Sequence, residues 1–157
     1  MLMTKVFHFD FSREQYLCDA AVVWCFDHRF HQGFAKFLKR SGLVNIDAIK
    51  IAGGAKCLAS PAAETDREFV LEQIRTSIRL HATKVAILMV HTDCGAYGGL
   101  PAFGGNSQVE AQHLEAELRR AAANLQQAIP DLEIRACFVN FEGVWSVELA
   151  EWSMSAA

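Results

Sequence analysis

The sequence has no stretch of about 18 consecutive apolar residues, the length at which a segment becomes a candidate for crossing a bilayer. It also lacks runs of like charge and an excess of basic residues, because 15 Lys and Arg stand against 18 Asp and Glu. The net charge of −3 argues against nucleic acid and acidic membranes as partners, since both attract basic surfaces. Residues 1–10 contain no basic region followed by an apolar run, so we expect no secretory signal and a cytoplasmic location.

Proline is scarce, with three residues among 157, and no repeat, linker or low-complexity tract interrupts the chain. Hydrophobic residues make up 52% of the chain and charged residues 21%, which excludes a disordered protein and is sufficient for a core. We therefore expect a single domain over residues 1–157.

The sequence also lacks a Cys-x-x-Cys pair, and its five cysteines are an odd number without a signal for export. A disulfide framework is therefore not expected, and the cysteines are interpreted as metal ligands, reactive thiols or small core residues. For Cys18 and Cys137 we expect burial in the core. A phosphatase loop starting at Cys25 would need an arginine six residues later, where the sequence has His31, so thiol catalysis is the least favoured interpretation.

Short apolar runs alternate with longer segments of helical periodicity. The apolar runs predict strands over residues 20–25, 46–51, 84–90 and 133–141. Apolar residues three and four apart predict helices over residues 30–43, 66–81 and 107–129. This alternation favours an α/β fold of three layers, a mostly parallel sheet with helices on both faces.

Polar residues follow the first and third predicted strands at their carboxyl ends, which is where ligands bind in open parallel sheets. Cys25 ends the first strand, and His91 and Cys94 follow the third. If these two strands are neighbours, two thiols and an imidazole meet at one crevice. Such a set suits Zn²⁺, and three protein ligands with one open position is the arrangement of catalytic zinc sites.

Two further features lie beside these candidates. Asp27 and Arg29 are two residues apart on an extended segment, so they can form a charge-assisted pair at the site or an ordinary surface ion pair. Gly53 and Gly54, followed by Lys56, predict a tight turn or a concavity of backbone N–H groups that holds an anion.

Two motifs of the chain resemble those of the β-class carbonic anhydrases: Cys25-x-Asp27-x-Arg29 and His91-x-x-Cys94-Gly95-Ala96. The order of elements resembles that family as well. A glycine-containing loop follows the second strand, a helix leads into the third, and the late strand ends in an aromatic-acidic-Gly turn at residues 140–143. The resemblance covers about residues 20–147, so the chain is identified as a short, divergent relative of these enzymes.

The resemblance implies Zn²⁺ held by Cys25, His91 and Cys94, and a zinc-bound hydroxide that reversibly hydrates carbon dioxide to bicarbonate. Asp27 would either orient the zinc-bound water or occupy the fourth zinc position itself, and Arg29 would pair with it and draw it off the metal. Backbone groups at the substrate or oxyanion are expected at Gly53, Gly54, Gly95 and Ala96. The resemblance also implies a homo-oligomer, a dimer or a multiple of it.

Departures from the family pattern leave other functions open. His28 replaces a small serine, and residues 52–56 lack the arginine and asparagines of the usual loop. One alternative is a zinc hydrolase of carbon disulfide or carbonyl sulfide, and another is a non-catalytic module that binds an anion. His28, His31 and Tyr97 are candidate proton relays or pocket walls, and Trp145 and Trp152 are candidates for a subunit interface.

Overall fold

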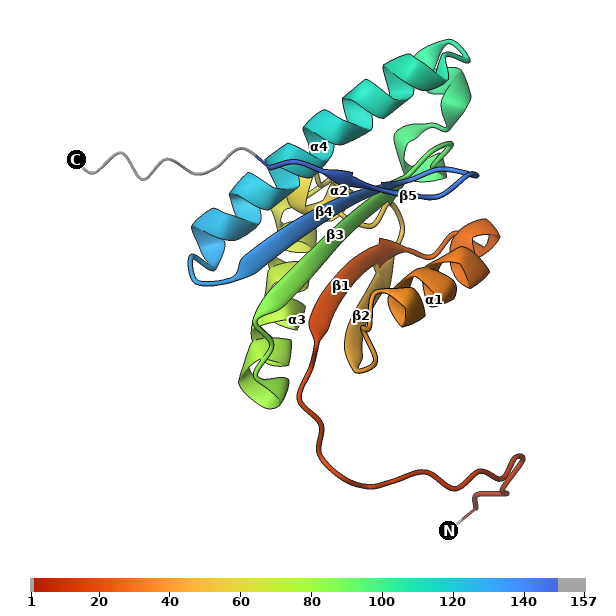
Figure 1. The fold of residues 1–157 in the computed structure, drawn as a ribbon, viewed down its shortest axis with the longest axis vertical. Helices are drawn as coiled ribbons and strands as arrows, with labels where there is room; N and C mark the ends of the chain where they lie inside the picture. The colour runs from red at the N-terminus through yellow and green to blue at the C-terminus, as the bar shows by residue number, and fades with distance from the viewer. Residues whose placement is uncertain (1, 150–157) are drawn as a thin grey trace, which may run out of the picture.

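The computed structural model describes residues 2–149, whose strands form one five-stranded sheet in the order β2-β1-β3-β4-β5 (Figure 1). The first four strands are parallel and the last is antiparallel to its neighbour. Their bounds are β1 Ala20–Cys25, β2 Ile46–Ile51, β3 Val85–His91, β4 Glu133–Val139 and β5 Val144–Val147. The predicted α/β class with a mostly parallel sheet is confirmed.

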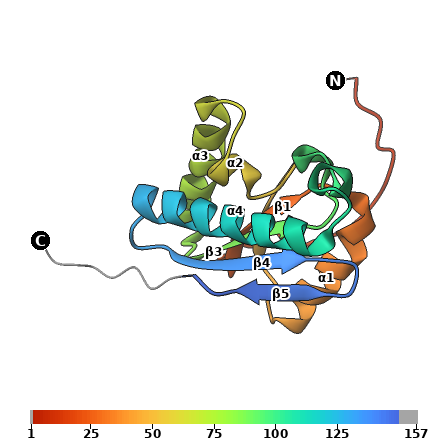
Figure 2. The ribbon, with the colours of Figure 1, turned by 90° about the horizontal axis from the view of Figure 1, so that it is seen from above.

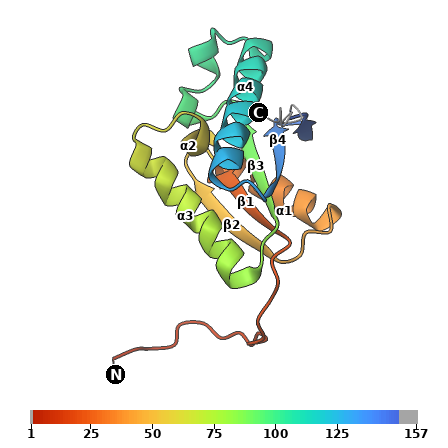
Figure 3. The ribbon, with the colours of Figure 1, turned by 90° about the vertical axis from the view of Figure 1, so that its left-hand side faces the viewer.

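Helices cover both faces of this sheet, so the three predicted layers are confirmed. The helices are α1 (His31–Arg40), α2 (Lys56–Ala59), α3 (Glu64–His81) and α4 (Ser107–Ala128). Figure 2 and Figure 3 show α1 on one face and α2, α3 and α4 on the opposite face. Short 3₁₀ turns, η1 (His28–Phe30), η2 (Gly95–Tyr97) and η3 (Leu100–Phe103), follow the carboxyl ends of β1 and β3.

Each face of the sheet packs against its own apolar cluster. On the α1 side, the ring of Trp24 stacks on Phe34 with 4.3 Å between the centroids. On the other side, residues of α3 and α4 such as Ile74 and Leu118 pack against the sheet. Because β1 is covered on both faces, all six of its residues are buried, which accounts for its continuous apolar sequence. Cys18 and Cys137 are buried, as expected.

Most boundaries agree with the predicted elements to within a few residues, and the differences have local causes. Strand β4 ends at Val139 because the side chain of Asn140 accepts hydrogen bonds from the N–H groups of Glu142 and Gly143 and starts a turn. That turn leads into β5, which was not predicted because it has only four residues. The four-residue α2 was also not predicted.

The amino-terminal arm, defined here as residues 2–17, contains no helix or strand and runs away from the body of the molecule (Figure 1). Phe7, Phe9 and Phe11 alternate along it and are exposed. Near its end, the hydroxyl of Tyr16 donates to Asp47 on β2 at 2.6 Å. Within residues 2–149, no helix is long and apolar enough to cross a membrane.

Candidate metal centre

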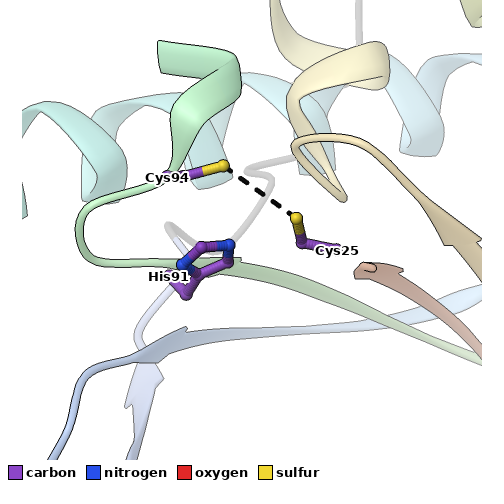
Figure 4. A group of neighbouring side chains, drawn as sticks. All are labelled: Cys25, His91 and Cys94. Atoms are coloured by element: carbon purple, nitrogen blue, oxygen red, sulfur yellow. Dashed lines mark hydrogen bonds between the residues drawn. The ribbon is translucent and has the colours of Figure 1, made fainter. Parts of the chain in front are cut away.

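Cys25, His91 and Cys94 meet at the carboxyl end of the sheet (Figure 4). Cys25 is the last residue of β1 and His91 the last of β3, and these strands are parallel neighbours. After β1 the chain continues to β2 on one side and later returns to β3 on the other, so the order reverses between β1 and β3. The three candidate ligand atoms all lie within 4.8 Å of one another, and the three residues are buried.

The hydrogen bonding of His91 leaves one ring nitrogen facing the two sulfurs. Its Nδ1 lies 2.7 Å from the carbonyl oxygen of Thr92, which can only accept, so Nδ1 carries the proton. In the neutral imidazole the lone pair is therefore on Nε2, which is buried and has no hydrogen-bond partner. Burial lowers the pKa of His91, but Cys25, the Thr92 carbonyl and Asp27 outweigh it and raise this pKa above its ordinary value. Within the described residues, the other buried side-chain nitrogen in this state is Nε1 of Trp24, which is only a donor and cannot bind a metal.

The two thiols are free and lie with their Sγ atoms 4.0 Å apart. The hydrogen bond from Cys94 lowers the pKa of Cys25 to about 4, and the N–H of Gly53 donates to the same sulfur at 3.4 Å. The Cys25 sulfur and burial raise the pKa of Cys94 above its ordinary value. One proton therefore lies between two sulfurs, and a cation in its place would be held by two thiolates.

Asp27 and Arg29 form the pair that the sequence predicted. Nε of Arg29 lies 3.1 Å from both carboxylate oxygens of Asp27, and Nη2 lies 2.7 Å from Oδ2. These bonds from Arg29 lower the pKa of Asp27 to about 2, so its carboxylate is ionised at neutral pH. Oδ2 of Asp27 lies 3.9 Å from Nε2 of His91, so the carboxylate is next to the cluster. Arg29 also donates to the side chain and the carbonyl of Asp93.

Gly53 and Gly54 form a tight turn against the end of β1. Gly54 has φ of +54°, and a Cβ there would lie 2.4 Å from the carbonyl oxygen of Met89, so no other residue fits. The N–H of Gly54 donates to Ile51, and that of Gly53 to the sulfur of Cys25. Both groups thus already have acceptors, and their expected role at the substrate stays a prediction.

Gly95 and Ala96 lie in η2, directly after Cys94. The backbone of Ala96 hydrogen-bonds the Cys94 sulfur and lowers the pKa of that thiol, against the larger effects of Cys25 and burial. A role for these residues at an oxyanion likewise stays a prediction. The hydroxyl of Tyr97 donates to Glu117 on α4 at 3.0 Å, so this group is engaged with the helix.

Aromatic rings lie beside the cluster on the α1 side. The ring of Phe30 lies 4.6 Å from that of His91 and stacks on Phe141, which is exposed. The guanidinium of Arg29 lies 5.5 Å from the Phe141 ring. His28 and His31 stack on each other, with 5.6 Å between their ring centroids.

Glu110 of α4, which is 1% exposed, was not predicted from the sequence as a site residue. Its carboxylate accepts hydrogen bonds from the hydroxyl of Thr92 and the N–H of Asp93, the two residues between the candidate ligands His91 and Cys94. A signal for it existed: Glu110 lies four residues before Leu114 and so continues the apolar stripe of this helix toward its amino end.

Residues 17–151 match the model of a family described as Putative carbonic anhydrase. No curated protein sequence matches the chain. Among solved structures, a carbonic anhydrase from Streptococcus mutans is 19% identical, with a TM-score of 0.58 over 85% of this chain and 84% of that one. A β-carbonic anhydrase from Trichomonas vaginalis is 14% identical, with a TM-score of 0.60 over 89% and 87%.

A carbon disulfide hydrolase in its apo form is also similar. It is 13% identical, with a TM-score of 0.55 over 90% of this chain and 85% of that one. At these identities the structural likenesses establish the fold, and the family model establishes the membership. The chain therefore belongs to this carbonic anhydrase family, as a divergent member with the β-carbonic anhydrase fold.

Proposed function

We propose that the protein is a zinc-dependent lyase that reversibly hydrates carbon dioxide to bicarbonate. The observation that carries this proposal is the buried, unpartnered Nε2 of His91, which faces two thiols and lies beside the ionised carboxylate of Asp27. A buried nitrogen without a partner is costly unless a ligand satisfies it.

The donor set fits Zn²⁺ better than the common alternatives. Two thiolates and one imidazole are soft and borderline ligands, whereas Mg²⁺ and Ca²⁺ prefer oxygen. Cys25, His91 and Cys94 would hold the ion and leave one position of a tetrahedron for a small molecule. When bound in such a site, Zn²⁺ acts as a Lewis acid that lowers the pKa of a water molecule to about 7.

The chain's own residues would orient the reactants. The carboxylate of Asp27 accepts a hydrogen bond from the water that adds to the carbon of carbon dioxide, and Arg29 keeps that carboxylate in place. Bicarbonate and one proton are the products. The neighbouring rings of Phe30 and Phe141 suit a small substrate without charge.

Metal content is the first test of this proposal. We expect about one zinc per chain in the purified protein and almost none in Cys94→Ser. Cys137→Ser is the matched control, because Cys137 is also buried but lies within β4, outside the cluster. An absence of zinc in the native protein after refolding with the metal would overturn the proposal.

Carbon dioxide hydration then tests the chemistry. Asp27→Asn should retain zinc and lose most of the activity at neutral pH, because the amide orients the water poorly. Full activity in this variant would contradict the role given to Asp27.

A second candidate is hydrolysis of carbon disulfide or carbonyl sulfide, which is favoured by the likeness to a carbon disulfide hydrolase and by the same apolar rings. Release of sulfide from these substrates, without hydration of carbon dioxide, would identify it. Saturable binding of bicarbonate by a protein without either activity would instead indicate the non-catalytic module.

We also propose that the protein is a cytoplasmic homodimer. The five free cysteines fit a reducing compartment, and the exposed Phe7, Phe9 and Phe11 of the amino-terminal arm fit burial against a second copy. Replacement of all three by Ser should convert the dimer to a monomer in sedimentation measurements at micromolar concentration. A native monomer would contradict this. Trp145 is exposed on β5, and Trp152 lies outside the described residues.

A further inference from the structure

Glu110 holds the loop that carries two of the candidate ligands. From the buried face of α4, Oε1 accepts a hydrogen bond from the N–H of Asp93 at 2.6 Å and Oε2 one from the hydroxyl of Thr92 at 2.5 Å. Within residues 2–149, no Lys, Arg or His side chain forms an ion pair with this carboxylate. A buried carboxylate without a cation is costly, so an apolar side chain at this position would be expected if packing were its role.

The two donors to Glu110 each connect it to a different half of the cluster. The carbonyl of Thr92 accepts the Nδ1 proton of His91 and so determines which nitrogen faces the thiols. The carboxylate and carbonyl of Asp93 accept hydrogen bonds from Arg29, which in turn holds Asp27. Glu110 therefore holds both the residue that orients His91 and the residue that binds Arg29, the partner of Asp27.

The loop also needs such support, because Asp93 has φ of +54°, a conformation that side chains other than glycine rarely adopt. Its N–H is held by Glu110 and its Oδ1 accepts from the N–H of Leu100 at 2.8 Å. Without the bond to Glu110, rotation of this residue would move Cys94 relative to Cys25, since Cys94 is the next residue.

We propose that Glu110 is a positioning residue of the metal centre, which holds residues 91–94 so that Nε2 of His91 and Sγ of Cys94 converge on Cys25. This rests on the metal site in the proposed function. Hydrogen-bond partners behind metal ligands typically change metal affinity 10–100-fold when they are removed, and a comparable effect follows here.

Glu110→Gln tests this with a nearly isosteric change, because the amide retains only one acceptor for the two donors. Glu117→Gln is the matched control. Glu117 is also buried on α4, about two turns further along, and its carboxylate accepts hydrogen bonds from Ser60, Tyr97 and Arg120 and none from the 91–94 loop. Thr92→Val removes the hydroxyl donor to Glu110 and leaves the bond from the N–H of Asp93, and it serves if Glu110→Gln does not fold.

The readouts are zinc affinity in competition with a chelator and the absorption bands of the Co²⁺-loaded protein, which report thiolate coordination and geometry. We expect about 10–100-fold weaker zinc binding and altered bands in Glu110→Gln and Thr92→Val. In Glu117→Gln we expect unchanged bands and affinity within about 3-fold, although its thermal stability falls as well. The double variant Glu110→Gln with Thr92→Val should bind little worse than either single variant.

Tight binding in the native protein with unchanged affinity and bands in Glu110→Gln would overturn the positioning role and leave the metal site standing. Equal losses in Glu110→Gln and Glu117→Gln would also overturn it, because both would then act through general stability. A native protein that binds neither zinc nor cobalt would overturn the proposed function and this inference together.

Discussion

At the amino end of the sheet, Asp47 accepts hydrogen bonds from three side chains, whereas at the carboxyl end Nε2 of His91 has no partner. The donors to Asp47 are the hydroxyls of Tyr16 and Ser77, both at 2.6 Å, and Nδ1 of His81 at 2.7 Å. These donors come from the amino-terminal arm and from α3, so the cluster ties both to β2. The three donors thus all have the Asp47 carboxylate as their acceptor.

The difference separates two uses of clustered polar side chains. A polar cluster whose members satisfy one another contributes to stability and to a unique arrangement of its elements. A cluster that leaves an acceptor facing two thiols is incomplete without a ligand. The functional site is therefore indicated by the unpartnered nitrogen of His91 at the carboxyl end, and less by the presence of histidine and acidic residues as such. The amino end also has a His next to an Asp, but there the carboxylate accepts a hydrogen bond from Nδ1 of the imidazole.

Of the changes considered, removal of the metal from the carboxyl end should change the stability of the protein most. At a zinc concentration of about 1,000 times the Kd, a ligand bound only by the folded state adds about 4 kcal/mol to the free energy of unfolding. For a chain of this size that corresponds to about 8–16 °C in Tm. We expect a chelator to lower Tm by this amount in calorimetry, and Cys94→Ser to lose the response. If the chelator leaves Tm unchanged, the expectation that the cluster at the carboxyl end binds a metal is contradicted.

Asp47→Asn should destabilise the protein and leave the metal centre intact. The amide has one acceptor for three donors, so we expect a loss of about 1–3 kcal/mol in the free energy of unfolding measured with urea. Zinc affinity should stay within about 2-fold of the native value, since additivity holds for distant sites. The control is Asp131→Asn, an exposed residue, which should change little. A large loss of zinc affinity in Asp47→Asn would show that the two ends are coupled.

Acid should reduce the stability that Asp47 adds relative to Asn at this position. This is the smallest of the expected effects. Burial raises the pKa of Asp47, but hydrogen bonds from His81, Ser77 and Tyr16 outweigh it and hold the pKa below the ordinary 3.8. Its folded-state pKa is thus lower than its unfolded-state pKa. The stabilisation is complete above the ordinary value and is lost as the pH falls through the folded-state pKa.

We therefore expect the difference in unfolding free energy between the native protein and Asp47→Asn to shrink below about pH 4. Both proteins are measured without metal, so that loss of metal on protonation of the thiols and of His91 does not contribute to the difference. A difference that grows with acid would contradict the lowered pKa of Asp47.

Much of the fold was predictable because its signals are local. Strands β1 and β3 are buried on both faces, so each reads as an unbroken apolar run, and α3 and α4 have long stripes of helical period. Strand β5 has four half-buried or exposed residues and thus no such signal. The role of Glu110 was missed because a glutamate at an apolar position is recognisable only when the donors it meets are known.

The sequence by itself determined the chemistry that is available: two cysteines and a histidine directly after the first and third strands, with Asp27 and Arg29 two residues apart. Periodicity and strand ends are properties of neighbouring residues, so they can be read along the chain. The tertiary structure decided that β1 and β3 are adjacent, that Thr92 leaves Nε2 of His91 free, and that Arg29 bridges Asp27 to Asp93. These contacts join residues far apart in the chain or depend on backbone conformation, and only packing of the whole sheet and its helices specifies them.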